Sequence, residues 1–539
     1  MATDIGRASA FLASGTIVSR VLGFAKVAVF GWVIGQQGQA TDAFTVANQL
    51  PNTVYVIVAG GVLTAVLVPQ IVRSALHDDG GAAYVNKLLT VALVILAGAA
   101  IAATLLAAPL TTLVGGSFRN PGQLDLAIAF AYWCMPQIFF YGLYTVLGEV
   151  LNARKSFGPF TWVPVLNNVV AIGGLILFAV LFGGDSGELA AVDYTGSMIA
   201  VLAGSATLGV VVQAVSLFYF WRRIGLRFRP DFRWRGVGLG MTGRLAGWTF
   251  GMLLLTTIAG IVETRVVSAA SGSDASATML STAWLVFMLP HSVITVSIAT
   301  AYFTRMAEHV NANRINELRV DVSAAIRGIT VIITLAAAVI AVVAYPFSRI
   351  FILKGHFDQV QSLGNVIIAY VLGLVAFCIL FVIQRAFYAL SDTRTPFFFT
   401  LAQVVVVIVG VALCSLLPLQ WIAFGVALVV TIAGIIQLAI AAVLLRGRLG
   451  GLDGRRIALS LAKDAAAVVA PLVAGITLLM LLGGTHEGGF AVSGIVPAIL
   501  SMALIGAVMA VLYVCGLWLV RSAELRTVVE PLLARVRGR

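Results

Sequence analysis

The stretch SRVLGFAK, residues 19–26, places two cations, Arg20 and Lys26, inside an apolar segment that runs from about residue 8 to residue 35. A segment of this length and composition is typical of a membrane-spanning helix. A full charge near the bilayer centre costs roughly 2.5–3.5 kcal/mol on insertion scales, so such residues usually face a protein interior or a water-filled cavity. The two cations therefore predict a buried site for an anion.

The composition of the chain indicates a membrane protein throughout. Of its 539 residues, 60% are hydrophobic and only 10% are charged, and the mean hydropathy is +1.03. Soluble domains are far more polar than this. The four cysteines lie far apart in apolar runs, without a spacing typical of a disulfide or a metal site. We expect an all-α integral membrane protein with no metal and no cofactor.

Span length gives the number of crossings. A bilayer core of about 30 Å needs roughly 20 mostly apolar helical residues. By this rule the sequence predicts fourteen transmembrane helices, which begin near residues 8, 42, 88, 124, 159, 196, 239, 277, 322, 362, 396, 420, 462 and 492. An even number of spans places both termini on one side of the membrane.

The distribution of basic residues predicts which side that is. With a cytoplasmic N-terminus, 27 of the 34 lysines and arginines fall on the cytoplasmic side. Cytoplasmic loops of membrane proteins are enriched in positive residues, so both termini are predicted to be cytoplasmic. The same bias accounts for the net charge of +12, so nothing in the charge points to nucleic acid as a partner. The remaining cations lie in outside loops or within spans: Arg119, Arg349, Lys354, Arg20, Lys26, Arg265 and Arg385.

Two motifs recur in the second half of the chain at nearly one offset. Leu50-Pro51 is followed 239 residues later by Leu289-Pro290. GEVLNARKSFGP (148–159) resembles QRAFYALSDTRTP (384–396) at shifts of 236 and 237 residues. The offset predicts a duplication of six spans related by an axis along the membrane normal, as in two-lobed transporters. Chance similarity between proline-containing helices is the alternative.

Several residues within or near spans are candidates for a role. Proline removes a backbone donor and bends a helix, so Pro51 and Pro290 are interpreted as paired bends that line a central cavity, with lipid-exposed kinks as the alternative. Glu263 and Arg265 either line a cavity or form an interfacial ion pair. Arg20 and Lys26 could also pair with a buried glutamate instead of binding a ligand: Glu149 or Glu263.

No catalytic constellation is present in the sequence. Asp78-Asp79 would suggest a magnesium site against a diphosphate, but the loop has no further carboxylates, and Asp-Asp-Gly-Gly is typical of a turn. The basic loop 222–244 is expected to pack on anionic lipid headgroups, or else to dock an anionic substrate. We therefore predict that the protein is not an enzyme.

A set of motifs spread over both halves carries a family resemblance. They are SRVLGF (19–24), ATDAF (40–44), LPN (50–52), Val68-Pro69, Leu151-Asn152 with Phe157, Pro164, Asn167-Asn168, Gly355 with Phe357, and FYALSDTRTP (387–396). In this combination the chain resembles the MurJ (MviN) family of lipid II flippases, within the multidrug/oligosaccharidyl-lipid/polysaccharide exporter superfamily.

The resemblance implies two six-helix lobes around a central cavity and alternating access. The substrate implied is lipid II, an undecaprenyl-diphosphate-linked peptidoglycan precursor, carried from the inner to the outer leaflet of the bacterial cytoplasmic membrane. Arg20 matches a family arginine proposed to meet the diphosphate, and Lys26 stands where the family commonly has a second arginine. Asp42 matches the aspartate of ATDAF. Membrane lipids and proteins of cell-wall synthesis or division are the implied partners.

The chain also departs from the family. Many relatives have arginines after LPN in span two and before the Leu-Pro of span eight, where this chain reads TVYVIVAGG and WLVFMLP. An exporter of another polyprenyl-diphosphate-linked glycan, or a non-transporting scaffold of cell-wall synthesis, are therefore alternatives. The predicted organisation is an N-terminal six-helix lobe (1–223), a basic linker (224–243), a second six-helix lobe (244–447), two additional transmembrane helices (448–521) and a cytoplasmic tail (522–539).

Overall fold

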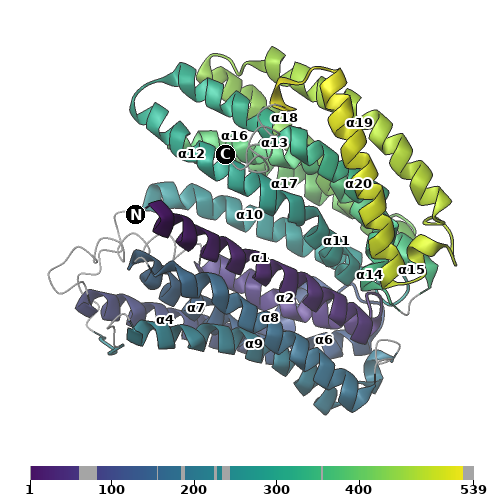
Figure 1. The fold of residues 1–539 in the computed structure, drawn as a ribbon. Coiled ribbons are helices and arrows are strands. Elements are labelled where there is room, and N and C mark those ends of the chain that lie inside the picture. Colours follow the sequence, from purple (N-terminus) through teal and green to yellow (C-terminus); the bar gives the residue numbers. More distant parts are fainter. Residues whose placement is uncertain are drawn as a thin grey trace. The chain divides into compact units, whose positions relative to one another are not determined.

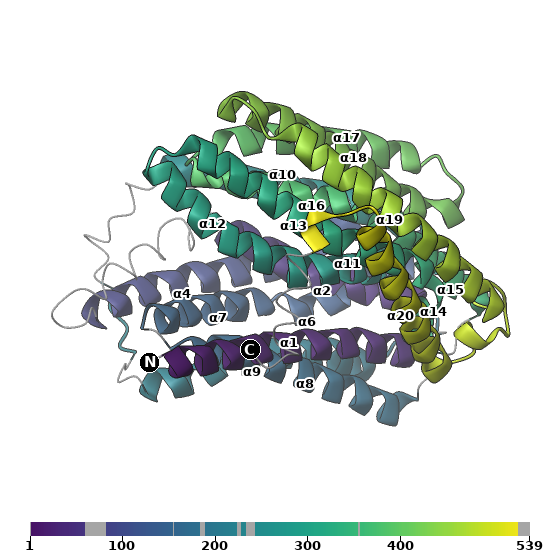
Figure 2. The ribbon, with the colours of Figure 1, turned by 45° about the horizontal axis from the view of Figure 1, so that its top comes forward.

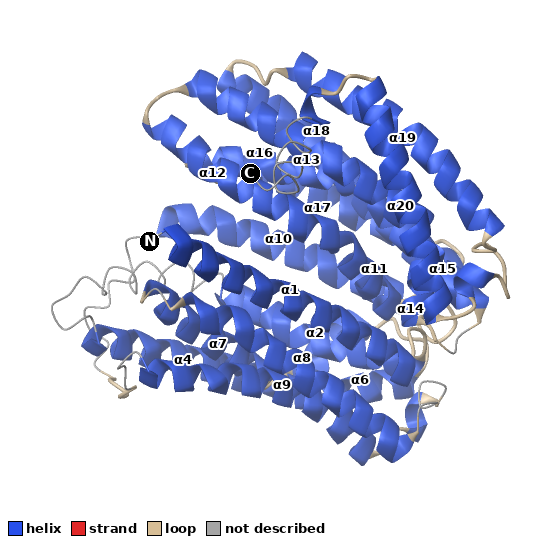
Figure 3. Ribbon diagram, viewed as in Figure 1, coloured by secondary structure: helices blue, strands red, loops and turns tan. Residues whose placement is uncertain are grey.

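The computed structural model describes residues 2–59, 82–154, 156–183, 189–223, 228–232, 243–353 and 356–525. Within these ranges the chain forms helices joined by loops, without a strand (Figure 3). It divides into two compact units, Met1–Thr278 and Met279–Arg539. The all-helical architecture predicted from composition is therefore confirmed.

The first unit is a bundle of long helices (Figure 1). Helix α8 packs along α9 and α1, α2 lies against α6, and α4 lies against α7. Helices α6 and α7 follow one another end to end, with Met135 and Pro136 at the break (Figure 2). In the described residues, the elements of this unit are α1 (Ala2–Val33), α2 (Gln39–Val58), α4 (Ala82–Leu105), α5 (Ala107–Gly115), α6 (Pro121–Cys134), α7 (Gln137–Ala153), α8 (Phe157–Phe182), η3 (Ala191–Asp193), α9 (Gly196–Arg223), α10 (Gly243–Val267), η4 (Ser268–Ala270) and the first two residues of α11 (Ala277–Pro290).

The second unit is arranged around α13. This helix packs against α12, α16 and α19, while α17 pairs with α18 and α19 pairs with α20. A hydrophobic cluster that includes Val331, Val468 and Met509 joins α19 and α20 to α13. Besides the rest of α11, the elements are η5 (His291–Thr295), α12 (Val296–Asn311), α13 (Ile315–Val342), α14 (Ala344–Phe351), α15 (Phe357–Val371), α16 (Leu374–Ala389), α17 (Arg394–Cys414), α18 (Leu419–Leu449), α19 (Gly454–Leu481), η6 (Phe490–Val492) and α20 (Ile495–Leu519).

The described residues contain twelve helices long and apolar enough to cross a membrane, or thirteen if α15 and α16, bent by 40° at their break, form one span. Each of the fourteen predicted spans has a helix at its position. The predicted span that is missing from these thirteen is α2, because its polar residues Asp42, Asn48, Gln49 and Asn52 make it less apolar than the others. A multi-pass membrane protein is confirmed, while the count of fourteen stays a prediction.

The breaks between helices repeat with the offset found in the sequence. Leu106 separates α4 from α5, and Val343 separates α13 from α14 exactly 237 positions later. The same 237 residues separate Pro136, which precedes α7, from Gly373, which precedes α16. They also separate the first residues of α8 and α17. Helix breaks placed alike in both halves favour the duplication over chance similarity, and the symmetry axis stays a prediction.

The predicted domain boundaries are not tested by this division into units. Helix α10, assigned from sequence to the second lobe, packs on α5 and α2 of the first unit. Some positions singled out in the sequence lie outside the described residues: Val68-Pro69, Asp78-Asp79, Gly355, most of the basic loop 222–244 and the tail from residue 526 onward.

Candidate substrate and gating site

The motif SRVLGF holds α1 against α8. Asn168, on α8, donates its amide Nδ2 to the backbone oxygen of Ser19 at 2.9 Å. Gly23 faces the same asparagine, and a Cβ built on Gly15, two turns earlier on this face, would lie 2.7 Å from the indole of Trp162. Small residues allow two membrane helices to approach closely. Two motifs far apart in the sequence, SRVLGF and Asn167-Asn168, thus form one contact.

Arg20 and Lys26 both lie on α1 and are partly buried. Lys26 forms no hydrogen bond or ion pair with any residue in the described part of the chain, so pairing with Glu149 or Glu263 is not observed for it. Lys26 follows Arg20 by six residues, which places it about 9 Å further along the helix at 1.5 Å per residue. An uncompensated ammonium on an apolar helix is the kind of group that would bind an anion.

Asp42 is a buried carboxylate of the first unit with several hydrogen-bond partners. It is fully buried in the first turn of α2. Its Oδ2 accepts a hydrogen bond from Ser271 Oγ at 2.5 Å, and its Oδ1 accepts from the backbone N–H and the hydroxyl of Thr278 at 3.0 and 2.8 Å. Thr278 lies in the first turn of α11, where backbone N–H groups and the helix dipole favour a negative charge. Asp42 therefore caps α11 from another helix.

Neighbouring amides reinforce this connection. Gln123 donates Nε2 to the backbone oxygen of Gln39 at 2.9 Å and lies 2.6 Å from Ser271 Oγ. Gln37 donates its side-chain amide to the backbone oxygen of Ser273. The start of α2 is thus joined to the loop between η4 and α11 by several hydrogen bonds. We call this set of contacts the α2–α11 latch.

Glu263 faces a cavity of about 250 Å³ between α2 and α10. The polar side chains that line it are Gln49, Asn52, Thr53, Thr257, Glu263 and Thr264. Pro51 is buried in the same turn of α2 as Leu50 and Asn52, which also line the cavity. A lipid-exposed kink at Pro51 is therefore not what the structure shows.

Arg265 points away from that cavity. It is exposed, and its Nη1 donates to the backbone oxygen of Leu113 near the end of α5 at 2.9 Å. Residues two apart on a helix lie on nearly opposite faces. In the structure Glu263 and Arg265 accordingly form no ion pair with each other. The carboxylate faces a cavity, and the guanidinium satisfies the end of a neighbouring helix.

Pro290 ends α11 and is buried, like Pro51. The five residues that follow it form η5, a single turn of π-helix. His291 in this turn is 3% exposed, and its ring packs edge-on against Phe377 and Phe381 of α16. Single turns of π-helix within α-helices are frequent at functional sites. This turn is a bend in the span that begins with α11.

Arg385 is a cation whose environment sequence reasoning missed. Its guanidinium lies 4.7 Å from the ring centre of Phe381 and 5.5 Å from that of Phe303. It has no acidic partner among the described residues. The sequence feature that could have indicated this environment is Phe381, which lies one helical turn before Arg385 on the same helix. The rings hold the guanidinium in place and leave its donors available.

Comparison with known proteins places these features in a family. The family model described as "Lipid II flippase MurJ" matches residues 33–501. The chain belongs to the lipid II flippase MurJ family. A protein of Rhizobium meliloti described as "Probable lipid II flippase MurJ" is 27% identical over 453 residues, which cover 82% of this chain and 81% of that protein. One of Borreliella burgdorferi with the same description is 24% identical, covering 74% and 76%.

Solved structures show the same fold. A structure of lipid II flippase MurJ in an inward closed conformation matches with a TM-score of 0.71 at 18% identity, covering 94% of this chain and 99% of that one. An inward-facing multidrug resistance transporter of the MATE family, in the MOP superfamily, matches with a TM-score of 0.64 at 16% identity, covering 80% and 96%.

The family assignment confirms several predictions. MurJ proteins are transporters rather than enzymes, and they are multi-pass membrane proteins, as the sequence indicated. The resemblance stated from SRVLGF and the other motifs is likewise confirmed. The site residues stay predictions.

Proposed function

We propose that this protein moves lipid II from the inner to the outer leaflet of the bacterial cytoplasmic membrane by alternating access. The family match over residues 33–501 supports this activity. The observation that carries the mechanism is the pair Arg20 and Lys26 on the apolar helix α1, with Lys26 unpaired among the described residues. A diphosphate is an anion that needs cations when it leaves water, whereas an isoprenoid tail can remain in lipid.

Arg20 and Lys26 are proposed to bind the diphosphate. A guanidinium binds two phosphate oxygens at once, and an ammonium acts as a point charge. The contact between Ser19, Gly23 and Asn168 supports this role, because it fixes the turn of α1 that carries Arg20. Arg385, held by two aromatic rings, is a further candidate for phosphate binding in the second unit.

The α2–α11 latch is proposed as the outer gate. The charge distribution predicts cytoplasmic termini, which places the loops before α2 and before α11 on the outer side. A buried carboxylate with three hydrogen bonds would hold these loops together while the substrate is loaded from the cytoplasm. Release to the outer leaflet would then require Asp42 to leave Ser271 and Thr278. We also propose that Glu263, Pro51 and Pro290 take part in this opening of the outer gate.

A second substrate is favoured by one observation. Where many relatives have charges before the Leu-Pro of span eight, this chain has Trp284 and Phe287, which pack with each other and with Tyr370 at ring separations of 5.0 to 5.9 Å. Of the three rings, Trp284 is 37% exposed and offers a face on which a sugar could stack, whereas Phe287 and Tyr370 are buried behind it. Another polyprenyl-diphosphate-linked glycan is therefore the alternative, and comparing lipid II with such a lipid at equal concentration distinguishes them.

The test is exposure of lipid II at the outer surface of cells depleted of the native protein and supplied with variants. Arg20→Ala is expected to reduce exposure by about tenfold or more, since charge-assisted hydrogen bonds contribute roughly 1.5–3 kcal/mol. Arg119→Ala is the matched control, because Arg119 is an exposed cation before α6. Full rescue by Arg20→Ala would refute the cation mechanism and favour a scaffold for proteins of cell-wall synthesis or division.

A further inference from the structure

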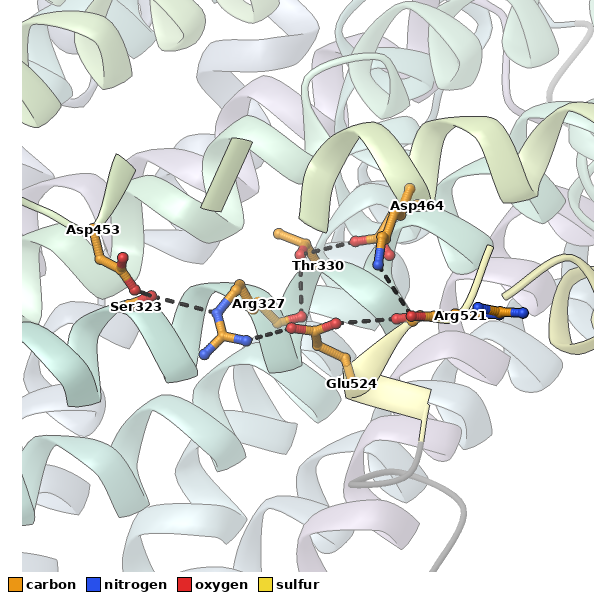
Figure 4. A network of polar contacts seen from close by, with 9 residues as sticks. Ser323, Arg327, Thr330, Asp453, Asp464, Arg521 and Glu524 are labelled. Carbon is orange, nitrogen blue, oxygen red and sulfur yellow. Dashed lines mark hydrogen bonds and ion pairs between the residues drawn. The ribbon is translucent and has the colours of Figure 1, made fainter. Parts of the chain in front are cut away.

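Polar side chains gather in the second unit where α13, α19 and the turn after α20 meet (Figure 4). The members with hydrogen bonds or ion pairs across these elements are Ser323, Arg327, Thr330, Asp453, Lys463, Asp464, Arg521 and Glu524. None of them belongs to the proposed transport site. They join the two C-terminal helices to the rest of the second unit.

Asp464 is the least satisfied carboxylate of this cluster. It is 1% exposed. Its Oδ2 lies 3.2 Å from Thr330 Oγ1, but that hydroxyl lies equally 3.2 Å from the backbone oxygen of Arg327. A hydroxyl has one proton, so it can donate to only one of them at a time. The other carboxylate oxygen, Oδ1, is buried without a hydrogen-bond partner in the described part of the chain.

Ser460 provides a second buried oxygen without a hydrogen-bond partner among the described residues. It lies one helical turn before Asp464 on α19, is 4% exposed, and its Oγ has no hydrogen-bond partner within the described ranges. Side chains four apart on a helix are neighbours, with about 5–6 Å between their Cβ atoms. Buried polar atoms are nearly always paired, so two orphaned oxygens one turn apart call for a ligand.

The nearby cations are engaged elsewhere. Arg327 pairs with Glu524, whose other oxygen accepts from Ser522 at 3.1 Å. The ammonium of Lys463 donates to the backbone oxygen of Arg521 at 3.0 Å. Arg327 and Glu524 therefore neutralise each other, and one negative charge is left on Asp464. A buried charge without a partner is strongly unfavourable.

We propose that Asp464, Ser460 and Thr330 form a binding site for a monovalent cation of the size of Na⁺. Carboxylate and hydroxyl oxygens suit a hard cation, and a single uncompensated carboxylate matches a single positive charge. Divalent and transition metals usually need more charged or nitrogen ligands, and no group of three or more His, Cys, Asp or Glu that could hold a metal occurs among the described residues. The bound cation fixes α19 against α13.

The test uses the purified full chain in detergent micelles. Its thermal unfolding midpoint is followed as NaCl replaces choline chloride at constant chloride concentration. A ligand that binds the folded state raises the midpoint in a saturable manner. We expect this response in the natural chain and no response in Asp464→Asn. In Ser460→Ala, which loses only a neutral ligand, half-saturation should require roughly tenfold more Na⁺.

Asp453→Asn is the matched control. Asp453 is an exposed carboxylate that accepts from Ser323 at 2.9 Å at the start of α19, so its variant should keep the natural Na⁺ response. The proposal is overturned if the natural chain unfolds alike in sodium and choline, or if Ser460→Ala responds like the natural chain. It is also overturned if Asp464→Asn keeps the Na⁺ response of the natural chain, because the carboxylate would then not bind the cation. Lipid transport does not enter these measurements, so a failed flipping assay leaves the cation site standing.

Discussion

At the scale of single residues, Lys26 allows a test of what the substrate site requires. Its ammonium has no partner among the described residues, and the resemblance to the family implies arginine as the common alternative at this place. Arginine adds a planar fork of donors that fits two phosphate oxygens, whereas methionine keeps the length and removes the charge. We expect Lys26→Arg to transport lipid II at least as fast as the natural chain. Lys26→Met should be slower by roughly tenfold.

The measurement is the initial rate at which lipid II becomes accessible at the outer surface, normalised to the amount of protein in the membrane. Arg265→Met serves for comparison, because that guanidinium is bound to the backbone oxygen of Leu113. Equal rates for Lys26→Met and the natural chain would show that Lys26 does not contact the diphosphate.

For single residues, the sequence can reveal an unusual side chain, but it does not reveal hydrogen-bond partners that lie far away along the chain. Arg20 and Lys26 were singled out because charges inside apolar segments are conspicuous, and Asp42 was singled out by its match to the ATDAF motif. The role of Asp42 as a cap could not be predicted, because Ser271 and Thr278 lie 229 and 236 residues away in the chain. The orphaned Asp464 was overlooked, although an aspartate in the run LAKDAAAVV carries the same signal as Arg20.

At the scale of elements, the pairing of Arg327 with Glu524 fastens the turn after α20 to α13. Burial alone raises the pKa of Glu524, but hydrogen bonds from its own backbone N–H, from Arg327 and from Ser522 outweigh burial and lower the pKa below its ordinary value of 4.5. A carboxylate with a lowered pKa in the folded state contributes stability that is fully present above the unfolded pKa. This stability is lost as the pH falls through the folded pKa.

Glu524→Gln is therefore expected to lower the free energy of unfolding at pH 7 by about 1–3 kcal/mol, since it leaves Arg327 without its charged partner. The natural chain should lose this difference below pH 4.5, so the two unfolding curves converge in acid. Thermal unfolding of the detergent-solubilised chain between pH 3 and pH 8, in steps of about one unit, checks both parts. Glu487→Gln is the control in an exposed loop, and a constant difference at all pH values would contradict the assignment.

Helix positions were the most predictable elements. Each of the fourteen apolar runs has a helix at its position, because the membrane leaves few alternatives to a helix. The breaks within spans were not predicted, with the exception of the bend at Pro290. Leu106 and Val343 interrupt helices in runs that remain apolar, and only their common offset of 237 residues reveals that the interruption belongs to the duplicated fold.

At the scale of the whole molecule, alternating access requires the outer ends of the two predicted lobes to separate. The α2–α11 latch joins the start of α2 to the loop after η4, which the sequence assigns to different lobes. A cross-link across this latch should stop transport, whereas a cross-link within the first lobe should not. Gln37 and Ser273 are in contact across the latch, and Asn120 donates to Gln39 Oε1 at 3.1 Å within the first lobe.

The experiment pairs Gln37→Cys with Ser273→Cys, and as its control Gln39→Cys with Asn120→Cys. Three of the four natural cysteines are buried, and the fourth, Cys515, lies on α20 far along the chain, so a short reversible dithiol cross-linker should act mainly at the new pairs. We expect the first pair to lose lipid II exposure on cross-linking and to recover it on reduction, because a closed outer gate blocks release. The control pair should transport throughout. Undiminished transport by the cross-linked first pair would mean that the outer ends of α2 and α11 stay together during the cycle, and that the substrate leaves by another route.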